Sequence, residues 1–282
     1  MSPSNPVKLP PRRTGTFNRP DCRLHYEVTG EGPPIIFLHG LGGNHLSWWQ
    51  QIAHFSRTHM CVALSARGFA PSGELPGGPD PKDYLGDLTA LIDALKLNSV
   101  ALVGQSMGGW SALEYALARP QNVRALVLAA TTGTIDPARI EGPERARLAD
   151  WQASSAAAAQ TLSANNIHVA AGACMAAEQP ALHLLYRHVD DMNASLDKMA
   201  LRKRLFDDRV RPPSDIAKVQ CPVLFVSGDE DIVIPPFAAD AIARLKPGTE
   251  VHHFSTAGHS AYFERAEAFN RVVGEFLASV PA

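Results

Sequence analysis

The pentapeptide Gly104-Gln105-Ser106-Met107-Gly108 constrains the fold more than any other part of this sequence. It follows the apolar run at residues 100–103 and precedes a helix-like stretch at 109–116, which predicts a strand that turns sharply into a helix. So tight a turn favours residues without a Cβ at both flanking positions, and both are glycines. The turn would expose the Ser106 hydroxyl and leave the Met107 N–H at a helix N-terminus, where negative charge is favoured. The alternative is an ordinary strand-to-helix connection.

A nucleophilic serine needs a base, because a hydroxyl is a weak nucleophile until its proton is removed, and it needs an acid to orient that base. In this type of turn both partners lie downstream. Among the 11 histidines, His259 alone lies downstream in a loop between a strand pattern, residues 250–254, and an amphipathic helix predicted over 261–277. His252 and His253 fall inside the strand pattern, and we interpret them as structural.

The acid is sought in the loop after a predicted strand that ends at Ser227. Three carboxylates follow it, Asp229, Glu230 and Asp231. A carboxylate there can reach the histidine of the next loop, because both loops lie at the carboxyl edge of one parallel sheet. The loop alone does not say which of the three does so; the others would cap the following helix or face water.

With these segments the chain resembles the α/β-hydrolase fold family, from about residue 17 to residue 277. The likeness is carried by His39-Gly40-Leu41-Gly42-Gly43 after an apolar strand, the turn at Ser106, Gly228-Asp229-Glu230-Asp231 with Pro235, and Gly258-His259 followed by Glu264-Arg265. The resemblance implies an α/β fold whose mostly parallel, eight-stranded sheet is flanked by helices.

The resemblance also implies site residues. It places the catalytic acid at Asp231, with Asp229 as the main alternative, and the absence of a carboxylate at residues 130–133, after the preceding strand, favours that assignment. It gives the two N–H donors of an oxyanion hole as those of Leu41 and Met107, with Gly42 as the neighbour of Leu41.

One segment departs from the family pattern. Relatives commonly read Asp-x-Arg-Gly-x-Gly-x-Ser after the fourth strand, whereas residues 65–72 read Ser-Ala-Arg-Gly-Phe-Ala-Pro-Ser. Ser65 replaces the aspartate and Ala70 replaces a glycine. That aspartate is mainly structural in the family, so the expected fold stands. The geometry of this loop, and any role of Arg67 in a pocket, are left open.

The alternation of strand and helix patterns divides the chain. Residues 1–15 are expected to be a flexible lead-in, 16–132 and 215–282 to form the α/β core, and 133–214, where strand patterns disappear, to form several helices. By resemblance, an insertion after the sixth strand is a helical cap over the site, and a cap excludes water and shapes a pocket. The expected pocket side chains, apart from Gly42, are Trp48, Trp110 and Tyr186, with packing of the two tryptophans on the sheet as the alternative. We interpret Arg202-Lys203-Arg204 as a solvated helix face, with preference for an anionic substrate as the alternative.

Composition narrows the partners. A net charge of -2 gives no basic footprint for nucleic acid. No stretch approaches the ~20 apolar residues of a membrane helix, and no apolar signal core opens the chain. The 4 cysteines have neither metal-ligand nor disulfide spacing, which favours a reducing cytoplasm. We therefore expect a cytoplasmic protein that acts on a small molecule without cofactor or metal; a homo-oligomer is left open.

Together these features predict a serine hydrolase with a Ser106-His259-Asp231 triad that forms an acyl-enzyme from an ester, lactone or related carbonyl compound. The resemblance extends to carboxylesterases, enol-lactonases and carbon–carbon hydrolases of ring-cleavage products. A serine at the turn argues against haloalkane dehalogenase and epoxide hydrolase chemistry, which uses aspartate there. Three alternatives stay open: a C–C bond hydrolase, a ligand-binding receptor with slow or no turnover, and a cofactor-free perhydrolase.

Overall fold

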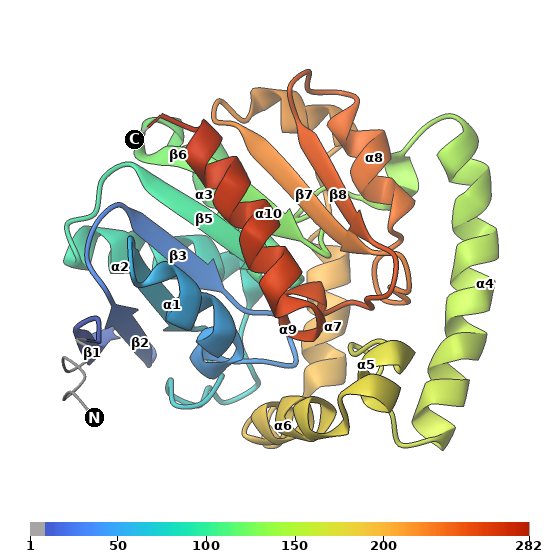
Figure 1. The fold of residues 1–282 in the computed structure, drawn as a ribbon, viewed down its shortest axis with the longest axis horizontal. Coiled ribbons are helices and arrows are strands. Elements are labelled where there is room, and N and C mark those ends of the chain that lie inside the picture. Colours follow the sequence, from blue (N-terminus) through green and yellow to red (C-terminus); the bar gives the residue numbers. More distant parts are fainter. Residues whose placement is uncertain (1–8, 282) are drawn as a thin grey trace, which may run out of the picture.

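One eight-stranded sheet runs through the centre of the molecule (Figure 1). The computed structural model describes residues 9–281. The strands are β1 (Arg12–Asn18), β2 (Arg23–Thr29), β3 (Pro34–Leu38), β4 (Met60–Ser65), β5 (Val100–Gln105), β6 (Val123–Ala129), β7 (Val223–Gly228) and β8 (Glu250–Phe254). Their order is β1-β2-β4-β3-β5-β6-β7-β8, with β2 antiparallel to β1 and β4 and all other pairs parallel. The expected fold class is confirmed.

Helices cover both faces of this sheet. One face carries α2 (Tyr84–Ala94), α3 (Gly108–Ala118) and α8 (Phe237–Ala243), and the other carries α1 (Trp49–Phe55), α9 (Ala261–Glu264) and α10 (Ala266–Ser279). In Figure 1, α1 and α10 lie in front of the sheet. Alternate strand residues face opposite sides, so Ile36 packs with the first group and Ile35 with the second. This double coverage explains why the central strands are continuous apolar runs.

Four α-helices between β6 and β7 form the helical insertion, which we define as residues 133–214. They are α4 (Pro143–Ala164), α5 (Ala173–Glu178), α6 (Pro180–Asp191) and α7 (Lys198–Asp207). Helices α5, α6 and α7 lie beyond the carboxyl ends of the parallel strands, whereas α4 runs along the side of the molecule near α8 (Figure 1). Short 3-10 helices occupy His45–Trp48, Pro81–Asp83, Pro120–Asn122, Pro137–Arg139 and Pro213–Lys218.

Two expectations about the ends of the chain need correction. Of the expected lead-in, residues 1–8 lie outside the described residues, but residues 12–15 belong to β1, where Arg12 pairs with Glu27 of the neighbouring strand at 2.7 Å. The single helix expected over 261–277 is broken at Arg265, whose backbone leaves the helical region. The Arg265 side chain instead donates to the Thr256 carbonyl and pairs with Glu178 of the helical insertion at 2.7 Å.

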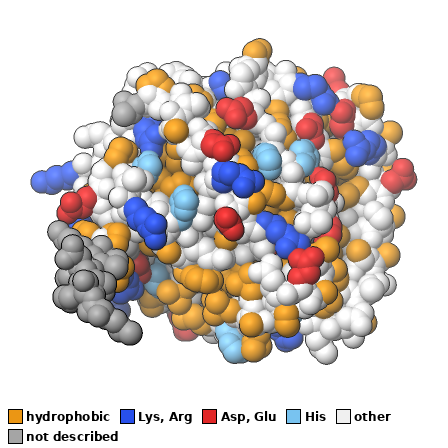
Figure 2. All heavy atoms as spheres, viewed as in Figure 1, with side chains coloured by type: hydrophobic (Ala, Val, Ile, Leu, Met, Phe, Trp, Pro, Cys, Tyr) orange, Lys and Arg blue, Asp and Glu red, His pale blue; other side chains and the backbone are white. Residues whose placement is uncertain are grey.

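Positive and negative side chains are interspersed over the face shown in Figure 2. Within residues 9–281, no helix combines the length and the hydrophobicity needed to cross a membrane.

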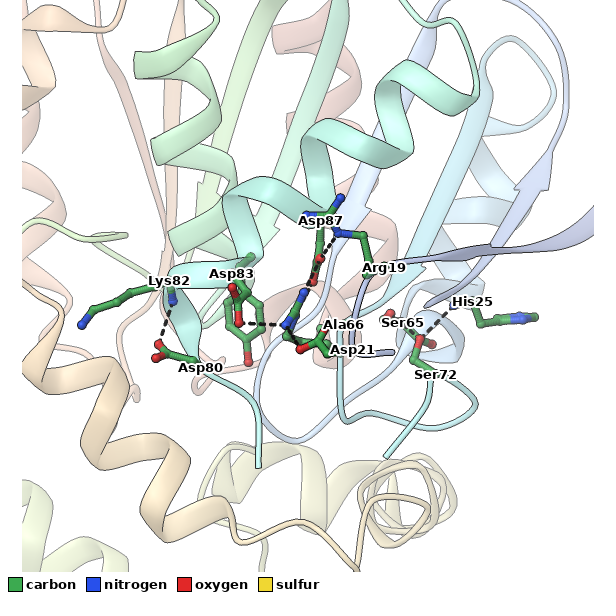
Figure 3. Close-up of polar contacts among 12 residues, drawn as sticks. Arg19, Asp21, His25, Ser65, Ala66, Ser72, Asp80, Lys82, Asp83 and Asp87 are labelled. Atoms are coloured by element: carbon green, nitrogen blue, oxygen red, sulfur yellow. Dashed lines mark hydrogen bonds and ion pairs between the residues drawn. The ribbon is translucent and has the colours of Figure 1, made fainter. Parts of the chain in front are cut away.

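An ion network holds the loop after β4 against α2. The Arg67 guanidinium donates two hydrogen bonds to the Asp87 carboxylate, at 2.6 and 2.7 Å, and further bonds to Asp21 and Asp83, which are half exposed. Figure 3 shows Asp21, Asp83 and Asp87 gathered at this place. Arg19 Nε contacts the same Asp87 carboxylate at 2.9 Å. Arg67 therefore has a structural role, and it is not among the residues that line the cavity at Ser106.

We expect Asp87→Ala to lower the free energy of unfolding by about 3–5 kcal/mol, because it removes a buried partner of a buried guanidinium. Asp83→Ala removes a half-exposed partner of the same guanidinium and should cost only about 0.2–1 kcal/mol. Urea denaturation of both variants measures the difference. Equal losses would contradict the view that the buried pair carries the network.

Candidate active site

The turn at Ser106 has the geometry that its sequence requires. Ser106 has φ 49°, in the left-handed region that side chains rarely adopt, and its N–H donates to the Ala129 carbonyl at 3.0 Å. A Cβ at Gly104 would lie 2.7 Å from the Gly108 carbonyl oxygen, and a Cβ at Gly108 would collide with the Leu38 carbonyl. The two flanking glycines therefore let helix α3 approach β3 and β5 while Ser106 projects from the turn.

Two backbone N–H groups remain free beside Ser106. Those of Leu41, in the loop after β3, and Met107, at the start of α3, donate to no acceptor within residues 9–281. Both residues line the same cavity as Ser106. Free N–H groups at such a position can stabilise negative charge that develops on a carbonyl oxygen.

Buried histidines hold the Leu41 loop in place. His39 accepts from the Ala66 N–H at Nε2, 2.9 Å, so its proton lies on Nδ1, which donates to the Gly40 carbonyl at 2.8 Å. Burial lowers the pKa of His39 to about 4, which keeps the ring neutral in this arrangement. His39 is thus committed to the backbone.

Ser65, which stands where relatives carry aspartate, links two loops. Its Oγ lies 2.9 Å from His45 Nδ1 and donates to the Ala70 carbonyl at 3.2 Å. Burial also lowers the pKa of His45, to about 4, so a neutral hydroxyl suits this neutral ring. The departure in sequence therefore leaves the loop anchored on both sides.

His259 and Asp231 form a buried hydrogen-bonded pair. His259 Nδ1 lies 2.8 Å from Asp231 Oδ2, and both residues are less than 5% exposed, at 4% and 3%. The other carboxylate oxygen accepts from the N–H groups of Val233 at 2.7 Å and Ile234 at 3.0 Å. Because all three bonds come from one loop and one ring, the carboxylate can hold the imidazole in a single orientation.

The other two acids of the loop point elsewhere. Asp229, half exposed, contacts His253 Nδ1 at 3.0 Å on the outer side of β8. Glu230 accepts from Cys174 Sγ of α5 at 2.9 Å. Of the three carboxylates, only that of Asp231 is brought to His259.

Ser106 and His259 line one cavity, although their side chains form no hydrogen bond with each other within residues 9–281. The bond from His259 Nδ1 to Asp231 leaves Nε2 as the nitrogen available to the serine. Gln105, next to Ser106, donates from Nε2 to the His259 carbonyl at 3.0 Å and so ties the two loops together. Bonds of this kind are often long in unliganded structures and tighten around a substrate.

The cavity has a volume of about 200 Å³ and lies between the core and the helical insertion. The core contributes Leu41, Gly42, Gln105, Ser106, Met107, Trp110, Val233, Ile234 and His259. The insertion contributes His168, Val169, Ala170, Tyr186, Asp190, Lys198, Met199, Arg202, Leu205, Phe206 and Arg209. More than half of the lining residues thus come from the helical insertion, whose sequence predicts helices but does not predict which of their side chains face the site.

Three of the four expected pocket residues line this cavity, and one does not. Gly42, Trp110 and Tyr186 are present, and a side chain at Gly42 would press on the Tyr186 hydroxyl. Trp48 does not line the cavity, which corrects that expectation in favour of the alternative: it is fully buried, with its ring 4.3 Å from that of Tyr262 and 5.1 Å from that of Phe37 in β3. Its place at the start of α1 turns the indole toward the sheet instead of the cavity.

Sequence reasoning missed most of the charges in the cavity. Lys198 Nζ pairs with Asp190 at 2.6 Å, and His168 lies 3.4 Å from the same carboxylate. Burial disfavours the Asp190 anion, but the bonds from His168 and Lys198 outweigh it, and the pKa of Asp190 lies below its ordinary value. Arg202 and Arg209 also line the cavity. In the sequence, only the basic run at 202–204 indicated charge near the cavity, because single charged residues in a predicted helical region form no recognisable pattern.

Residues 33–266 match the profile of a protein family described as the alpha/beta hydrolase fold. The chain belongs to the α/β-hydrolase fold family. A 2-hydroxy-6-oxononadienedioate/2-hydroxy-6-oxononatrienedioate hydrolase from Pseudomonas putida is 30% identical over 271 residues, covering 91% of this chain and 92% of that protein.

Solved structures show the same fold at lower sequence identity. The enol-lactonase from Burkholderia xenovorans LB400 superposes with a TM-score of 0.74 at 22% identity, covering 94% of this chain and 100% of that one. A thermophilic esterase from Thermogutta terrifontis superposes with a TM-score of 0.71 at 23% identity, covering 95% and 98%.

In this α/β-hydrolase a buried carboxylate brackets the His259 loop. Glu264 accepts from the N–H groups on both sides of the histidine, those of Gly258 at 2.9 Å and Ser260 at 3.0 Å. Burial raises the pKa of Glu264 to about 7, against the effect of these donors. The folded protein therefore holds this proton more tightly than the unfolded chain does.

We expect the free energy of unfolding to fall as the pH rises from about 4.5 to about 7, by at most about 1.4 kcal/mol per pH unit from this group. Below that window Glu264 is protonated in both states and has no effect on the slope. Glu264→Gln mimics the protonated form and should remove this part of the slope. Urea denaturation of both proteins at several pH values gives the difference, and parallel curves would show that Glu264 does not titrate in this range.

Proposed function

We propose that this protein is a serine hydrolase that cleaves a carboxylic ester, a lactone or a related carbonyl compound through an acyl-enzyme on Ser106. The observation that carries the proposal is the shared cavity of Ser106, two free N–H groups and a histidine bonded to a buried carboxylate. Each is a part that acyl transfer needs: a nucleophile, a stabiliser of the oxyanion and an oriented base.

The proposed reaction has two steps. His259 Nε2 takes the Ser106 proton as Oγ attacks the carbonyl carbon, and the N–H groups of Leu41 and Met107 hold the oxyanion. Collapse of this intermediate expels the alcohol, which takes the proton from His259 and leaves an ester on Ser106. Water, activated by His259, then attacks that ester and releases the acid. In both steps Asp231 stabilises the positively charged imidazole.

The helical insertion is proposed to act as a cap. Eleven of the residues around the cavity come from it, and Tyr186 of α6 accepts a hydrogen bond from Ser260, next to His259, at 2.9 Å. A cap of this kind excludes water from the oxyanion and shapes the space for a small-molecule substrate.

A second candidate is C–C bond hydrolysis, favoured by the relative at 30% identity. The compound in that relative's name contains a ketone and two carboxylates but no ester, so its hydrolysis must break a carbon–carbon bond. The same nucleophile, base and oxyanion donors would serve this reaction at a ketone. The two candidates differ in the bond cleaved, and a substrate panel separates them.

We expect Ser106→Ala and His259→Ala each to lower turnover of p-nitrophenyl esters by about 10⁴-fold while the folded state persists. The panel combines short p-nitrophenyl esters, lactones and a vinylogous diketone, assayed with wild type and both variants. Turnover of the diketone alone would favour the second candidate. A wild-type protein that turns over none of these compounds would contradict the proposed function, and near-wild-type activity of Ser106→Ala would exclude the acyl-enzyme.

The choice of acid is tested by a matched pair of variants. Asp231→Asn keeps the shape of the side chain but removes the charge and favours the wrong ring tautomer, so kcat should fall by about 10³- to 10⁴-fold. Asp229→Asn, two residues earlier in the same loop, should leave kcat within about twofold, because its carboxylate contacts His253. The reverse pattern would transfer the role to Asp229.

A further inference from the structure

Arg209 is a cation of the Ser106 cavity that has no anionic partner. Its Nε is buried and has no hydrogen-bond acceptor within residues 9–281, and no carboxylate of these residues lies within ion-pair distance of its guanidinium. By contrast, Lys198 of the same cavity is paired with Asp190. A buried N–H donor without an acceptor is costly, so such a donor beside a cavity points to a ligand that supplies the acceptor.

Aromatic rings hold this guanidinium in place. Its central carbon lies 4.9 Å from the Trp110 ring centre and 4.5 Å from that of Phe206. Stacking of this kind stabilises the charge through the faces of the rings, while the N–H donors, which lie in the guanidinium plane, stay available. The contacts with the two rings therefore limit the positions that the Arg209 guanidinium can take before a ligand binds.

A second free donor belongs to the same group. Trp110 Nε1 is also buried without an acceptor within residues 9–281, and Trp110 lines the cavity four residues after Ser106. Arg202, in α7 and seven residues before Arg209, adds another cation that forms no ion pair with the described residues. Two buried N–H donors and two unpaired positive charges thus gather beside one wall of the cavity.

The position of Arg209 leaves room for a ligand beside it. A second cavity of about 400 Å³, lined by Trp151 and other residues of α4, shares Arg202, Phe206, Arg209 and Val233 with the first. Arg209 therefore stands where the two cavities meet, and one end of a substrate bound at Ser106 can reach it. Leu205, Met199 and Phe206 provide apolar surface for the chain between the two ends.

We propose that Arg209, with the indole N–H of Trp110, binds a carboxylate of the substrate, so that the preferred ester or lactone carries a second, free carboxylate. This inference rests on the proposed hydrolase function. Arg209 is then a specificity-determining residue. Its paired N–H groups donate to the planar carboxylate of the substrate, and the attack by Ser106 is unchanged. Arg202 adds long-range attraction for the anion.

The test compares two esters of equal shape, p-nitrophenyl hydrogen adipate and its neutral carboxamide analogue. Wild type should prefer the acid ester in kcat/KM. Arg209→Gln should lower kcat/KM for the acid ester by about 10- to 100-fold, as expected for the loss of a hydrogen bond to a charged group, and change the amide ester by less than about twofold. Arg209→Lys should restore part of the preference, and Lys203→Gln, an exposed position of α7, should leave it intact.

A binding measurement separates this inference from the proposed function. Ser106→Ala should bind adipate more tightly than adipamide by calorimetry, and the added Arg209→Gln should remove the difference. That result would support the subsite even if wild type cleaved neither ester, in which case only the hydrolase proposal would fall. If Arg209→Gln lowered both esters equally, or if adipate bound no better than adipamide, Arg209 would be a packing residue and the subsite would be excluded.

Discussion

The close contact of helix α3 with β3 and β5 determines the geometry of the candidate site at Ser106. Gly104 and Gly108 bring the helix so close that a side chain at either position would strike backbone atoms. This approach forces Ser106 into the left-handed region and points its side chain away from the sheet. Met107 follows in the same turn, and its N–H, like that of Leu41, has no acceptor within residues 9–281, while both residues line the cavity. One packing constraint thus creates both the nucleophile position and the polar surroundings of the carbonyl it would attack.

The parallel strands then bring distant segments together at their carboxyl edge. The loops after β3, β5, β7 and β8 meet there, which is why residues as far apart as Leu41 and His259 line one cavity. Short-range bonds fix each loop by itself: His39 holds the Leu41 loop, two backbone N–H groups hold Asp231, and Glu264 brackets His259. The proposed active site is therefore rigid on its core side, and preorganisation of this kind is what oxyanion stabilisation requires.

The helical insertion gives the cavity its chemical character. The core part of the lining contains no Asp, Glu, Lys or Arg, whereas α6 and α7 add Tyr186, Asp190, Lys198 and Arg202, and Arg209 follows directly. The paired charges of Lys198 and Asp190 neutralise each other, whereas Arg209 lies close to the rings of Trp110 and Phe206 and forms no ion pair within residues 9–281. The proposed acyl transfer would in this way be combined with the proposed carboxylate subsite at Arg209.

The sequence by itself determined the alternation of strands and helices, the turn at Ser106 and the loop that carries His259, because each rests on local patterns of apolar residues and glycine. Its local pattern left three acids open after β7, of which the family resemblance favoured Asp231. It did not decide whether Trp48 faces the cavity or the sheet, and it did not predict that the last helix breaks at Arg265 or that Arg209 reaches the cavity. Those outcomes depend on which side chains meet across long sequence distances: Asp231 is selected by its contact with His259, and Arg209 by its stacking on Trp110. Only the tertiary structure decided them, because local patterns place a residue on an element, whereas packing alone decides what its side chain meets.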